Sequence, residues 1–389
     1  EVRADWKKML ARKDEVIGKL RNGIASLLKS AGVTVFGGRG EFLSRRQLMV
    51  AAGEATGTVI EADKFIIATG SDPLVPGFIP KGDRILTSTE LLSLPKLPKS
   101  LLILGGGVIG CEFACLFAEL GVEVTVVEML PQILPQTDGE CAKLLAKLMA
   151  GKGIRILNGT PLTDIRCTAR GVSGKVGDET LKADYLLVSI GRKPVTADLN
   201  LPAAGVKTDQ RGFIEVDDSF RTSAPNIYAI GDAVGRIMLA HWASAAAGNV
   251  VNTLRGKPEE FTGALTPGCI FTSPEIGTIG KSEEQLRSEG VAYSVGKFPF
   301  AALGKAMAMN QTEGFVKILA DAESDQVLGI HIIGPHATDL IAEAGPAMLM
   351  EITAKELGRA IHAHPTLGEA MMEAAHAVHG ECAHMPTRK

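Results

Sequence analysis

A glycine-rich loop between a short apolar strand and a helix constrains the fold of this chain more than any other feature of its sequence. Residues 101–104 are all apolar, and Gly105, Gly107 and Gly110 follow in the spacing G-x-G-x-x-G at the start of a helical pattern. In such a loop the first glycine allows a tight turn, the second lets the backbone approach a pyrophosphate, and the third lets the helix pack on the strand. The loop therefore predicts a Rossmann-like α/β unit with a dinucleotide bound at the helix N-terminus.

An acidic residue strengthens this prediction. The next apolar strand, "VEVTVVE", ends at Glu128, a little over twenty residues after Gly105. A carboxylate at this place in the motif accepts hydrogen bonds from the adenosine ribose hydroxyls. A 2′-phosphate would instead require a basic residue, and "EMLPQILPQTD" contains none. The pattern favours NAD over NADP, although the loop on its own is also compatible with a glycine-rich turn in an ordinary βαβ unit.

The composition narrows the class of protein. The chain has 389 residues, a formal net charge of −3 and 44 glycines, which is typical of an ordered, turn-rich α/β protein of two or three domains. Lysine and arginine are scattered without a basic stripe, so nucleic acid is not an expected partner. No apolar run is long enough to span a membrane and no signal-peptide pattern opens the sequence, so we expect no membrane partner and a cytoplasmic location.

The cysteines give no disulfide framework. Six occur, and none forms a C-x-x-C pair or a zinc-ribbon spacing. Cys111 and Cys115 lie four residues apart on the helix predicted after the glycine loop. Two interpretations are open for them, a redox pair or two small side chains packed against a sheet, and packing is the simpler one. A reducing compartment agrees best with this usage.

Local patterns divide the chain into α/β and antiparallel parts. An amphipathic helix is expected over residues 5–32, strands over 33–44 and 64–71, and a proline-broken boundary at 94–100. Past position 263, stretches typical of antiparallel strands occur at 268–280, 291–300 and 314–334, before apolar helical patterns close the chain. The predicted fold class is α/β with an α+β part at the C-terminal end.

The segment "IHAHPTLGEA", residues 361–370, places two histidines, a proline and a glutamate within ten positions. These residues alone are compatible with a metal site, a helix start with incidental histidines, or an acid–base pair. Pro365 suits the first turn of a helix, which would place Glu369 about one turn into it and within hydrogen-bonding reach of His364. The tail "HAVHGECAH" (376–384) also offers metal ligands, but its spacing matches no standard zinc pattern, and we expect no metal.

Seven motifs follow one another along the chain: "IIATGSDP" (66–73), "GGGVIGCE" (105–112), "SIGRKP" (189–194), "IYAIGDA" (227–233), "LAHWA" (239–243), "FTSPEIG" (271–277) and "HAHPTLGE" (362–369). Together they resemble the flavin-dependent pyridine-nucleotide disulfide oxidoreductases and, within this family, the dihydrolipoyl dehydrogenases. The resemblance covers essentially the whole chain and implies FAD and NAD as cofactors. It implies Rossmann-like NAD(P)/FAD-binding domains and a C-terminal α+β dimerisation domain, divided as follows: 1–97, a remnant of the FAD-binding domain; 98–194, the NAD-binding domain; 195–264, the return to the FAD domain; 265–389, the dimerisation domain.

The resemblance also implies roles for single residues. Asp232 would hydrogen-bond the ribityl chain of FAD, and Gly70 and Gly191 would lie where the chain crosses between the FAD and NAD domains. Glu112 would lie near the nicotinamide. His241 marks the start of a helix whose N-terminal amides would face the flavin and stabilise negative charge on it.

For residues 361–370 the resemblance favours the acid–base interpretation. His364 and Glu369 would form a dyad that serves the active site of the partner subunit in a homodimer. A carboxylate near a helix N-terminus is favoured in its ionised form and raises the basicity of the histidine beside it. Such a dyad suits a base that takes protons from a dithiol near neutral pH.

The sequence departs from the family at its beginning. Family members start with a first G-x-G-x-x-G for the ADP part of FAD and then a C-x4-C redox disulfide, and neither motif occurs here. We therefore expect an N-terminally truncated chain with an incomplete FAD site, inactive as given in thiol–disulfide chemistry.

The implied activity of the intact enzyme is the oxidation of dihydrolipoamide to lipoamide, with electrons passing through the disulfide and FAD to NAD⁺. Its partners would be the lipoyl domains of 2-oxoacid dehydrogenase complexes or of the glycine cleavage system. Two alternatives stay open: a non-catalytic NAD-binding or dimerisation fragment, and a mercury, glutathione or transhydrogenase relative from the same family. Glu128 argues against the glutathione type, and a histidine rather than a tyrosine at position 364 argues against the other two.

Overall fold

The computed structural model describes residues 4–258, 261 and 263–385, and the chain divides into two compact units. Unit 1 is drawn from residues 1–74, 89–97 and 191–263. Unit 2 is drawn from residues 75–88, 98–190 and 264–389. Each unit is thus assembled from three separate stretches of the chain.

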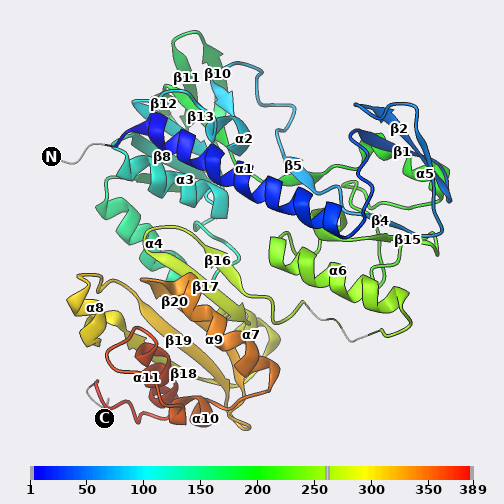
Figure 1. Ribbon diagram of the computed structural model, residues 1–389. Helices are drawn as coiled ribbons and strands as arrows, with labels where there is room; N and C mark the ends of the chain where they lie inside the picture. Colours follow the sequence, from blue (N-terminus) through cyan, green and yellow to red (C-terminus); the bar gives the residue numbers. More distant parts are fainter. Residues whose placement is uncertain (1–3, 259–260, 262, 386–389) are drawn as a thin grey trace. The chain divides into compact units, whose positions relative to one another are not determined.

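Unit 1 combines small sheets with the helices α1 and α6 (Figure 1). Strands β1, β2 and β3 form an antiparallel sheet, β4 pairs with β15 in parallel, and β5 pairs with β14 antiparallel. The short helix α2 (Ser88–Leu91) lies where the chain re-enters this unit. The elements of unit 1 are α1 (Trp6–Ser30), β1 (Arg39–Ser44), β2 (Gln47–Ala52), β3 (Val59–Glu61), β4 (Phe65–Ile67), β5 (Ser71–Pro73), β14 (Arg192–Pro194), η1 (Ala197–Leu199), α5 (Leu201–Ala204), β15 (Ile227–Ala229), η2 (Gly231–Val234) and α6 (Ala240–Leu254).

The predicted N-terminal helix is confirmed as α1, whereas the strand expected over residues 33–44 is shorter and begins only at Arg39. Just before it, Gly38 passes so close to the neighbouring strand that a Cβ would lie 2.3 Å from the carbonyl oxygen of Ala52. The backbone therefore bends at this glycine instead of extending the ladder. Neither α1 nor any other described helix is both long and apolar enough to cross a membrane.

The core of unit 1 is rich in aromatic side chains. The buried rings of Phe220 and Trp242 meet edge to face with their centroids 5.4 Å apart. Such a pair contributes about 0.5–1.5 kcal/mol beyond the burial of its area. Strands β4 and β15 pack on this core and, because they are parallel, they end at the same edge, where Gly70 and Asp232 follow.

The first half of unit 2 is built on a five-stranded parallel sheet with the order β6-β13-β7-β8-β9. Helix α3 connects β7 to β8, and α4 connects β8 to β9, which confirms the predicted Rossmann-like unit. A three-stranded antiparallel sheet, β10-β11-β12, precedes β13. The elements are β6 (Ile85–Leu86), β7 (Ser100–Leu104), α3 (Val108–Glu119), β8 (Glu123–Glu128), α4 (Gly139–Gly151), β9 (Arg155–Asn158), β10 (Thr163–Thr168), β11 (Gly171–Val176), β12 (Glu179–Ala183) and β13 (Tyr185–Val188).

The second half of unit 2 is a five-stranded antiparallel sheet with the order β16-β17-β20-β19-β18. Helix α9 packs on β17 and β20, and α11 packs on β18 and β19 (Figure 1). The elements are β16 (Gly268–Ile270), β17 (Glu275–Gly280), α7 (Glu283–Glu289), β18 (Tyr293–Pro299), η3 (Phe300–Ala302), α8 (Gly304–Ala308), β19 (Phe315–Asp321), β20 (Val327–Gly334), α9 (Ala337–Leu349), α10 (Ala354–Arg359) and α11 (Glu369–Val378). The predicted fold class, α/β with a C-terminal α+β part, is confirmed.

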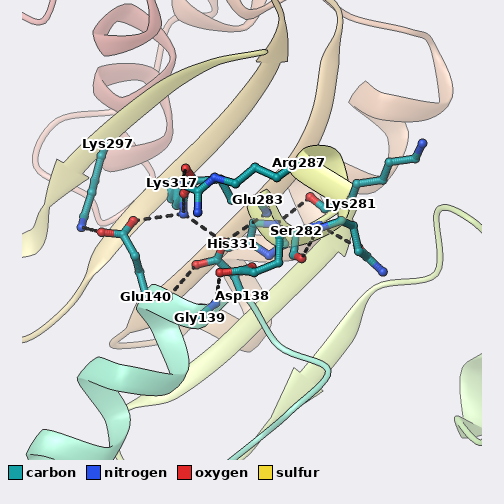
Figure 2. Close-up of polar contacts among 12 residues, drawn as sticks. Asp138, Gly139, Glu140, Lys281, Ser282, Glu283, Arg287, Lys297, Lys317 and His331 are labelled. Atoms are coloured by element: carbon teal, nitrogen blue, oxygen red, sulfur yellow. Dashed lines mark hydrogen bonds and ion pairs between the residues drawn. The ribbon is translucent and has the colours of Figure 1, made fainter. Parts of the chain in front are cut away.

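A network of charged side chains, referred to below as the Lys317 network, joins the two halves of unit 2 (Figure 2). Lys317 of β19 has no exposed surface, and its Nζ lies 2.9 Å from Asp138 and 3.0 Å from Glu140. The same ammonium group donates a hydrogen bond to Glu283 of α7. Asp138 is also the N-cap of α4 and accepts a hydrogen bond from the Glu140 N–H at 3.1 Å. The network therefore fixes the start of α4 against the antiparallel sheet.

Candidate active site

The glycine loop has the backbone geometry that its motif requires. Gly105 follows β7 with φ at +105°, and a Cβ there would lie 2.5 Å from the carbonyl oxygen of Ser189. At Gly110 in α3 a Cβ would lie 2.0 Å from the carbonyl oxygen of Gly105. Real Cβ atoms do not approach oxygen so closely, so a larger residue at Gly110 would push α3 away from the end of β7, and one at Gly105 would clash with the segment after β13.

Gly107 differs from the other two glycines of the motif, because nothing lies within 4 Å of the place where its Cβ would be. It is the N-cap of α3, with φ at −72°, and no side chain caps this helix. The backbone N–H groups of the first turn therefore face open space with the positive end of the helix dipole behind them. This cradle fits the pyrophosphate of a dinucleotide.

Glu128 lies beside the same loop at the end of β8, with 9% of its surface exposed. Its Oε2 accepts a hydrogen bond from the Gly106 N–H at 2.6 Å, and its Oε1 accepts one from the Leu130 N–H at 2.8 Å. These bonds hold the carboxylate in place, and each oxygen keeps a second lone pair for a ribose hydroxyl. The residues of the loop fit an adenosine diphosphate moiety without a 2′-phosphate.

Helix α3 also carries Glu112 and the two cysteines of uncertain role. The Oε1 of Glu112 accepts a hydrogen bond from the Phe271 N–H at 2.9 Å, and burial raises the pKa of this carboxyl group. Cys111 and Cys115 are free and buried, and burial raises the pKa of both thiols. A reactive thiol requires a lowered pKa and some exposure, so the geometry favours packing over a redox pair.

In unit 1, Asp232 is held by two residues that sequence reasoning did not single out. Ser71 donates from Oγ to the Asp232 carboxylate at 2.6 Å, and Arg192 donates from Nε to the same Oγ at 2.7 Å. Both residues are near neighbours of the predicted glycines, since Gly70 precedes Ser71 and Gly191 precedes Arg192. Ser71 lies in the motif "ATGS" and Arg192 lies in the motif "IGRKP", but only the pairing of β5 with β14 brings the two side chains together.

Gly70 and Gly191 lie at the margins of unit 1. Their φ angles are +73° and +135°, which favour glycine, and the Leu74 N–H donates to the Gly191 carbonyl oxygen at 3.0 Å. Helix α6 begins at Ala240, beside His241, and its N-cap Leu239 makes no side-chain capping bond. The positive end of the helix dipole at this start suits the edge of a flavin that carries negative charge.

The predicted dyad is present as a hydrogen-bonded pair. His364 Nδ1 lies 2.8 Å from Glu369 Oε1, and the Thr366 N–H donates to Glu369 Oε2 at 2.8 Å. Burial on its own would raise the pKa of Glu369, but the bonds from Thr366 and His364 hold this pKa below its usual value. The His364 side chain is 79% exposed, and its Nε2 has no hydrogen-bond partner among the described residues. Among the residues that the structure describes, no hydrogen bond or ion pair links the dyad to the glycine loop.

The helix after the dyad begins later than predicted. Helix α11 starts at Glu369, four residues beyond Pro365, so Glu369 is its first residue rather than a residue one turn inside. The turn before it is held by side chains: Thr366 donates from Oγ1 to the Ala363 carbonyl oxygen at 2.7 Å, and its N–H binds Glu369. These local bonds replace the first turn of the helix that the sequence pattern suggested.

Other histidines of this region pair individually with carboxylates. His362 lies 2.8 Å from Glu343 through Nε2 and binds the Ala360 carbonyl oxygen through Nδ1. In the tail, His379 pairs with Asp325. Among the described residues, no group of three or more His, Cys, Asp or Glu side chains is arranged to hold a metal ion.

Two models of known families match this chain. Residues 1–247 match the pyridine nucleotide-disulphide oxidoreductase family, and residues 266–375 match the dimerisation domain of the pyridine nucleotide-disulphide oxidoreductases. The second match supports the expected homodimer.

Curated relatives are similar over nearly the whole chain. Dihydrolipoyl dehydrogenase 3 of Pseudomonas putida is 41% identical over 379 residues, which are 96% of this chain and 81% of that protein. Dihydrolipoyl dehydrogenase of Chlamydia muridarum is 41% identical over 389 residues, which are 99% of this chain and 83% of that protein. These relatives confirm FAD and NAD as the expected cofactors, but they do not confirm the expectation that the chain is inactive through truncation.

Solved structures agree with the sequence comparison. The HOCl-induced flavoprotein disulfide reductase RclA from Escherichia coli has a TM-score of 0.89 and 30% identity, and the match covers 95% of this chain and 85% of that one. LpdA from Mycobacterium tuberculosis has a TM-score of 0.90 and 29% identity, with 96% and 83% covered. The chain therefore belongs to the pyridine nucleotide-disulphide oxidoreductase family.

Proposed function

We propose that the protein is a dihydrolipoyl dehydrogenase. The overall reaction converts dihydrolipoamide and NAD⁺ into lipoamide, NADH and one proton, so the dithiol loses two electrons and two protons, and NAD⁺ gains a hydride. The observation that carries this proposal is the His364–Glu369 dyad, in which one imidazole nitrogen is held by a carboxylate and the other is open. This arrangement suits the removal of a proton from a thiol.

In this proposal His364 accepts the proton of a substrate thiol at Nε2. Glu369 keeps the other nitrogen, Nδ1, protonated and stabilises the imidazolium that results. The Thr366 N–H helps to hold Glu369 in its ionised form, so the dyad contains a charged carboxylate. The exposure of His364 in the single chain leaves its Nε2 accessible to the site of the partner subunit, where the substrate thiol would lie.

The glycine loop would hold NAD, with the pyrophosphate at Gly107 and the adenosine ribose at Glu128. Asp232, with Ser71 and Arg192 behind it, would hold the ribityl chain of FAD. When bound, these cofactors supply hydride transfer, while the protein supplies placement and charge. Glu112 would lie near the nicotinamide, as the motif "GGGVIGCE" suggests.

The thiol–disulfide step needs a disulfide as electron acceptor, and Cys111 and Cys115 are poorly suited to it. Their thiols are buried and their pKa values are raised, whereas the thiolate is the reactive form. The acceptor in this family is the C-x4-C motif, which this sequence does not contain. We therefore do not assign the exchange to the α3 pair, and a test of this step requires a protein that carries the C-x4-C disulfide.

The activity test is NADH-dependent reduction of lipoamide by the FAD-loaded protein in a form that carries the C-x4-C disulfide. We expect lipoamide to be a better substrate than glutathione disulfide, and NADH to be a better donor than NADPH. Preference for another disulfide would assign the chain to a different activity of the same family. Binding of NADH with no disulfide turnover at all would support the non-catalytic alternative.

The cofactor site can be tested separately with Gly107→Asp. The position has open space and an ordinary φ, so the variant should fold, but its carboxylate would repel the pyrophosphate. We expect NADH affinity, measured by fluorescence titration, to fall while thermal stability is unchanged. Unchanged affinity would remove the loop from the site.

A mixed dimer tests whether His364 serves the partner subunit. One chain carries His364→Gln and the other carries Gly107→Asp, so a site shared between subunits leaves one complete combination. Activity near half of the wild-type value would support sharing. Inactivity of a folded mixed dimer would place the histidine in the site of its own chain.

Lipoyl domains of 2-oxoacid dehydrogenase complexes or of the glycine cleavage system are the partners we propose for this activity. The cytoplasmic location and the domain limits of 1–97, 98–194, 195–264 and 265–389 stay predictions.

A further inference from the structure

Helix α11 carries a second carboxylate–imidazole pair one turn beyond the dyad. Glu373 follows Glu369 by four residues, and its Oε1 lies 2.7 Å from His384 Nδ1. Its Oε2 lies 2.9 Å from Cys382 Sγ. Two glutamates on one face of one helix therefore each bind a histidine through Nδ1.

The two members of the second pair differ in burial. Glu373 is only 3% exposed, whereas the His384 side chain is 69% exposed. Burial on its own would raise the pKa of Glu373, but the bonds from Cys382 and His384 lower it, so Glu373 is a carboxylate at neutral pH. Burial and Glu373 raise the pKa of Cys382 to about 11, which leaves this thiol protonated and able to donate.

The C-terminal tail holds His384 in this position. Cys382 and Met385 pack against the core under the antiparallel sheet, on either side of His384 in the sequence. The tail thus returns along α11, and the second pair has packing on both sides.

We propose that Glu373 and His384 are positioning residues for the dyad, and that their combined charge sets the proton affinity of His364. This inference rests on the proposed function only in taking His364 as the catalytic base. Residues one turn apart on a helix have Cβ atoms about 5–6 Å apart, so a charge at Glu373 or His384 acts on the Glu369–His364 pair. The charge of His384 lowers the pKa of Glu369, in agreement with this proximity.

The sign of the effect follows from the charge of the second pair. With neutral His384 the pair carries −1, which favours the imidazolium form of His364. With protonated His384 the pair is neutral, and this support is lost. Protonation of His384 therefore lowers the pKa of His364, and the second pair limits how strongly the dyad holds its proton.

Several charged groups on the elements around α11 bind partners elsewhere, and α11 itself also carries His376 in its last turn. The elements packed against this helix are α10, β18 and β19, and their charged or titratable side chains are Lys355, Glu356 and Arg359, then Tyr293 and Lys297, then Lys317 and Asp321. Lys297 and Lys317 bind carboxylates outside α11, and Glu356 binds Thr353. At the far end of α11, His379 pairs with Asp325 and provides a matched control.

The experiment is an NMR titration of His364 in the FAD-loaded protein labelled with ¹³C at histidine Cε1, with His364→Gln identifying the resonance. We expect His384→Gln to raise the pKa of His364 by about half a unit, the interaction expected of unit charges about 7 Å apart in water. Glu373→Gln should lower the same pKa. The control His379→Gln should leave it unchanged.

Opposite shifts in the two variants support the proposal, because a merely structural role would not reverse sign. Shifts in the same direction, or none, would overturn it, and the exposed position of His384 makes at least that variant expected to fold. The titration needs no turnover, so its result is independent of the lipoamide assay. Failure of that assay in the wild-type protein would reject the proposed function, whereas the titration alone decides this inference. Where turnover occurs, the acid limb of kcat/KM should move with the His364 resonance.

Discussion

Two clusters of hydrogen-bonded, ionisable side chains in unit 2 differ in how deeply they are buried. In the Lys317 network both Lys317 and Asp138 have no exposed side-chain surface, whereas in the dyad His364 is 79% exposed. The network balances its charges, because Lys297 also pairs with Glu140 and Arg287 also pairs with Glu283, so that three cations face three carboxylates. The dyad instead keeps one ring nitrogen without a partner among the described residues.

The difference shows how burial decides what a charged group can do. Burial on its own would lower the pKa of Lys317, but its bonds to Glu283, Asp138 and Glu140 raise that pKa above its usual value. Such a lysine cannot give up its proton at any ordinary pH, so the network serves the structure. The dyad leaves the His364 Nε2 without a partner among the described residues, so a substrate proton can be accepted there.

The largest effect on activity is expected from His364→Gln in the FAD-loaded protein that carries the C-x4-C disulfide. Lipoamide reduction should slow by about 10² to 10⁴, the usual contribution of a positioned acid–base group. Oxidation of NADH by an artificial one-electron acceptor should stay near normal, because that route bypasses the thiols. Equal loss in both assays would mean that His364 supports the cofactor site rather than thiol chemistry.

The largest effect on stability is expected from Lys317→Met. Removing the cation leaves Asp138 buried without its partner, which should lower the free energy of unfolding by about 3–5 kcal/mol. The matched control is Lys175→Met, whose pair with Asp164 is exposed on both sides. Chemical denaturation of both variants measures the two losses of stability. Equal shifts of the two midpoints would show that the buried pair matters no more than the exposed one.

A pH series separates the clusters in another way. Burial lowers the pKa of His331, which lies beside the network and binds the Lys281 carbonyl oxygen through Nε2. The unfolded chain therefore binds a proton at this residue before the folded chain does, and stability falls as the pH drops below about 6.5.

The expected slope in that window is up to about 1.4 kcal/mol per pH unit for one such histidine. Denaturation at several pH values in wild type and His331→Phe measures it. The variant should lose part of the slope between pH 6.5 and the lowered folded-state pKa. An identical slope in both proteins would show that His331 is not the titrating group.

Local signals predicted the parts of the site that depend on neighbouring residues. Gly105 and Gly110 stand out because one turn needs a positive φ and one packing contact excludes a Cβ. The His364–Glu369 pair spans five residues, so spacing alone brought its members within reach. The late start of α11 escaped prediction because Thr366 binds Glu369 and Ala363 in place of helical partners.

Contacts between distant segments left no such signal. Lys317 and Asp138 are 179 residues apart, and only the packing of α4 on the antiparallel sheet brings them together. Arg192 and Ser71 meet because β14 pairs with β5. His384 was considered only as a metal ligand, because nothing in the sequence shows that the tail returns to Glu373.

The smallest effects are expected when one glutamate in each cluster is replaced by glutamine. Glu369→Gln keeps an oxygen for the His364 Nδ1–H but removes the charge that stabilises the imidazolium. Hydrogen bonds to charged groups contribute about 1.5–3 kcal/mol, and screening at this exposed site reduces that, so lipoamide turnover should fall only about tenfold. Glu283→Gln in the Lys317 network should leave turnover per folded molecule unchanged and lower the denaturation midpoint, because Lys317 then faces one charge fewer while buried. Steady-state kinetics and denaturation on both variants give a two-by-two comparison. A Glu369→Gln protein that loses stability but not activity would make the dyad a structural pair like the network, and would remove the basis for His364 as the base.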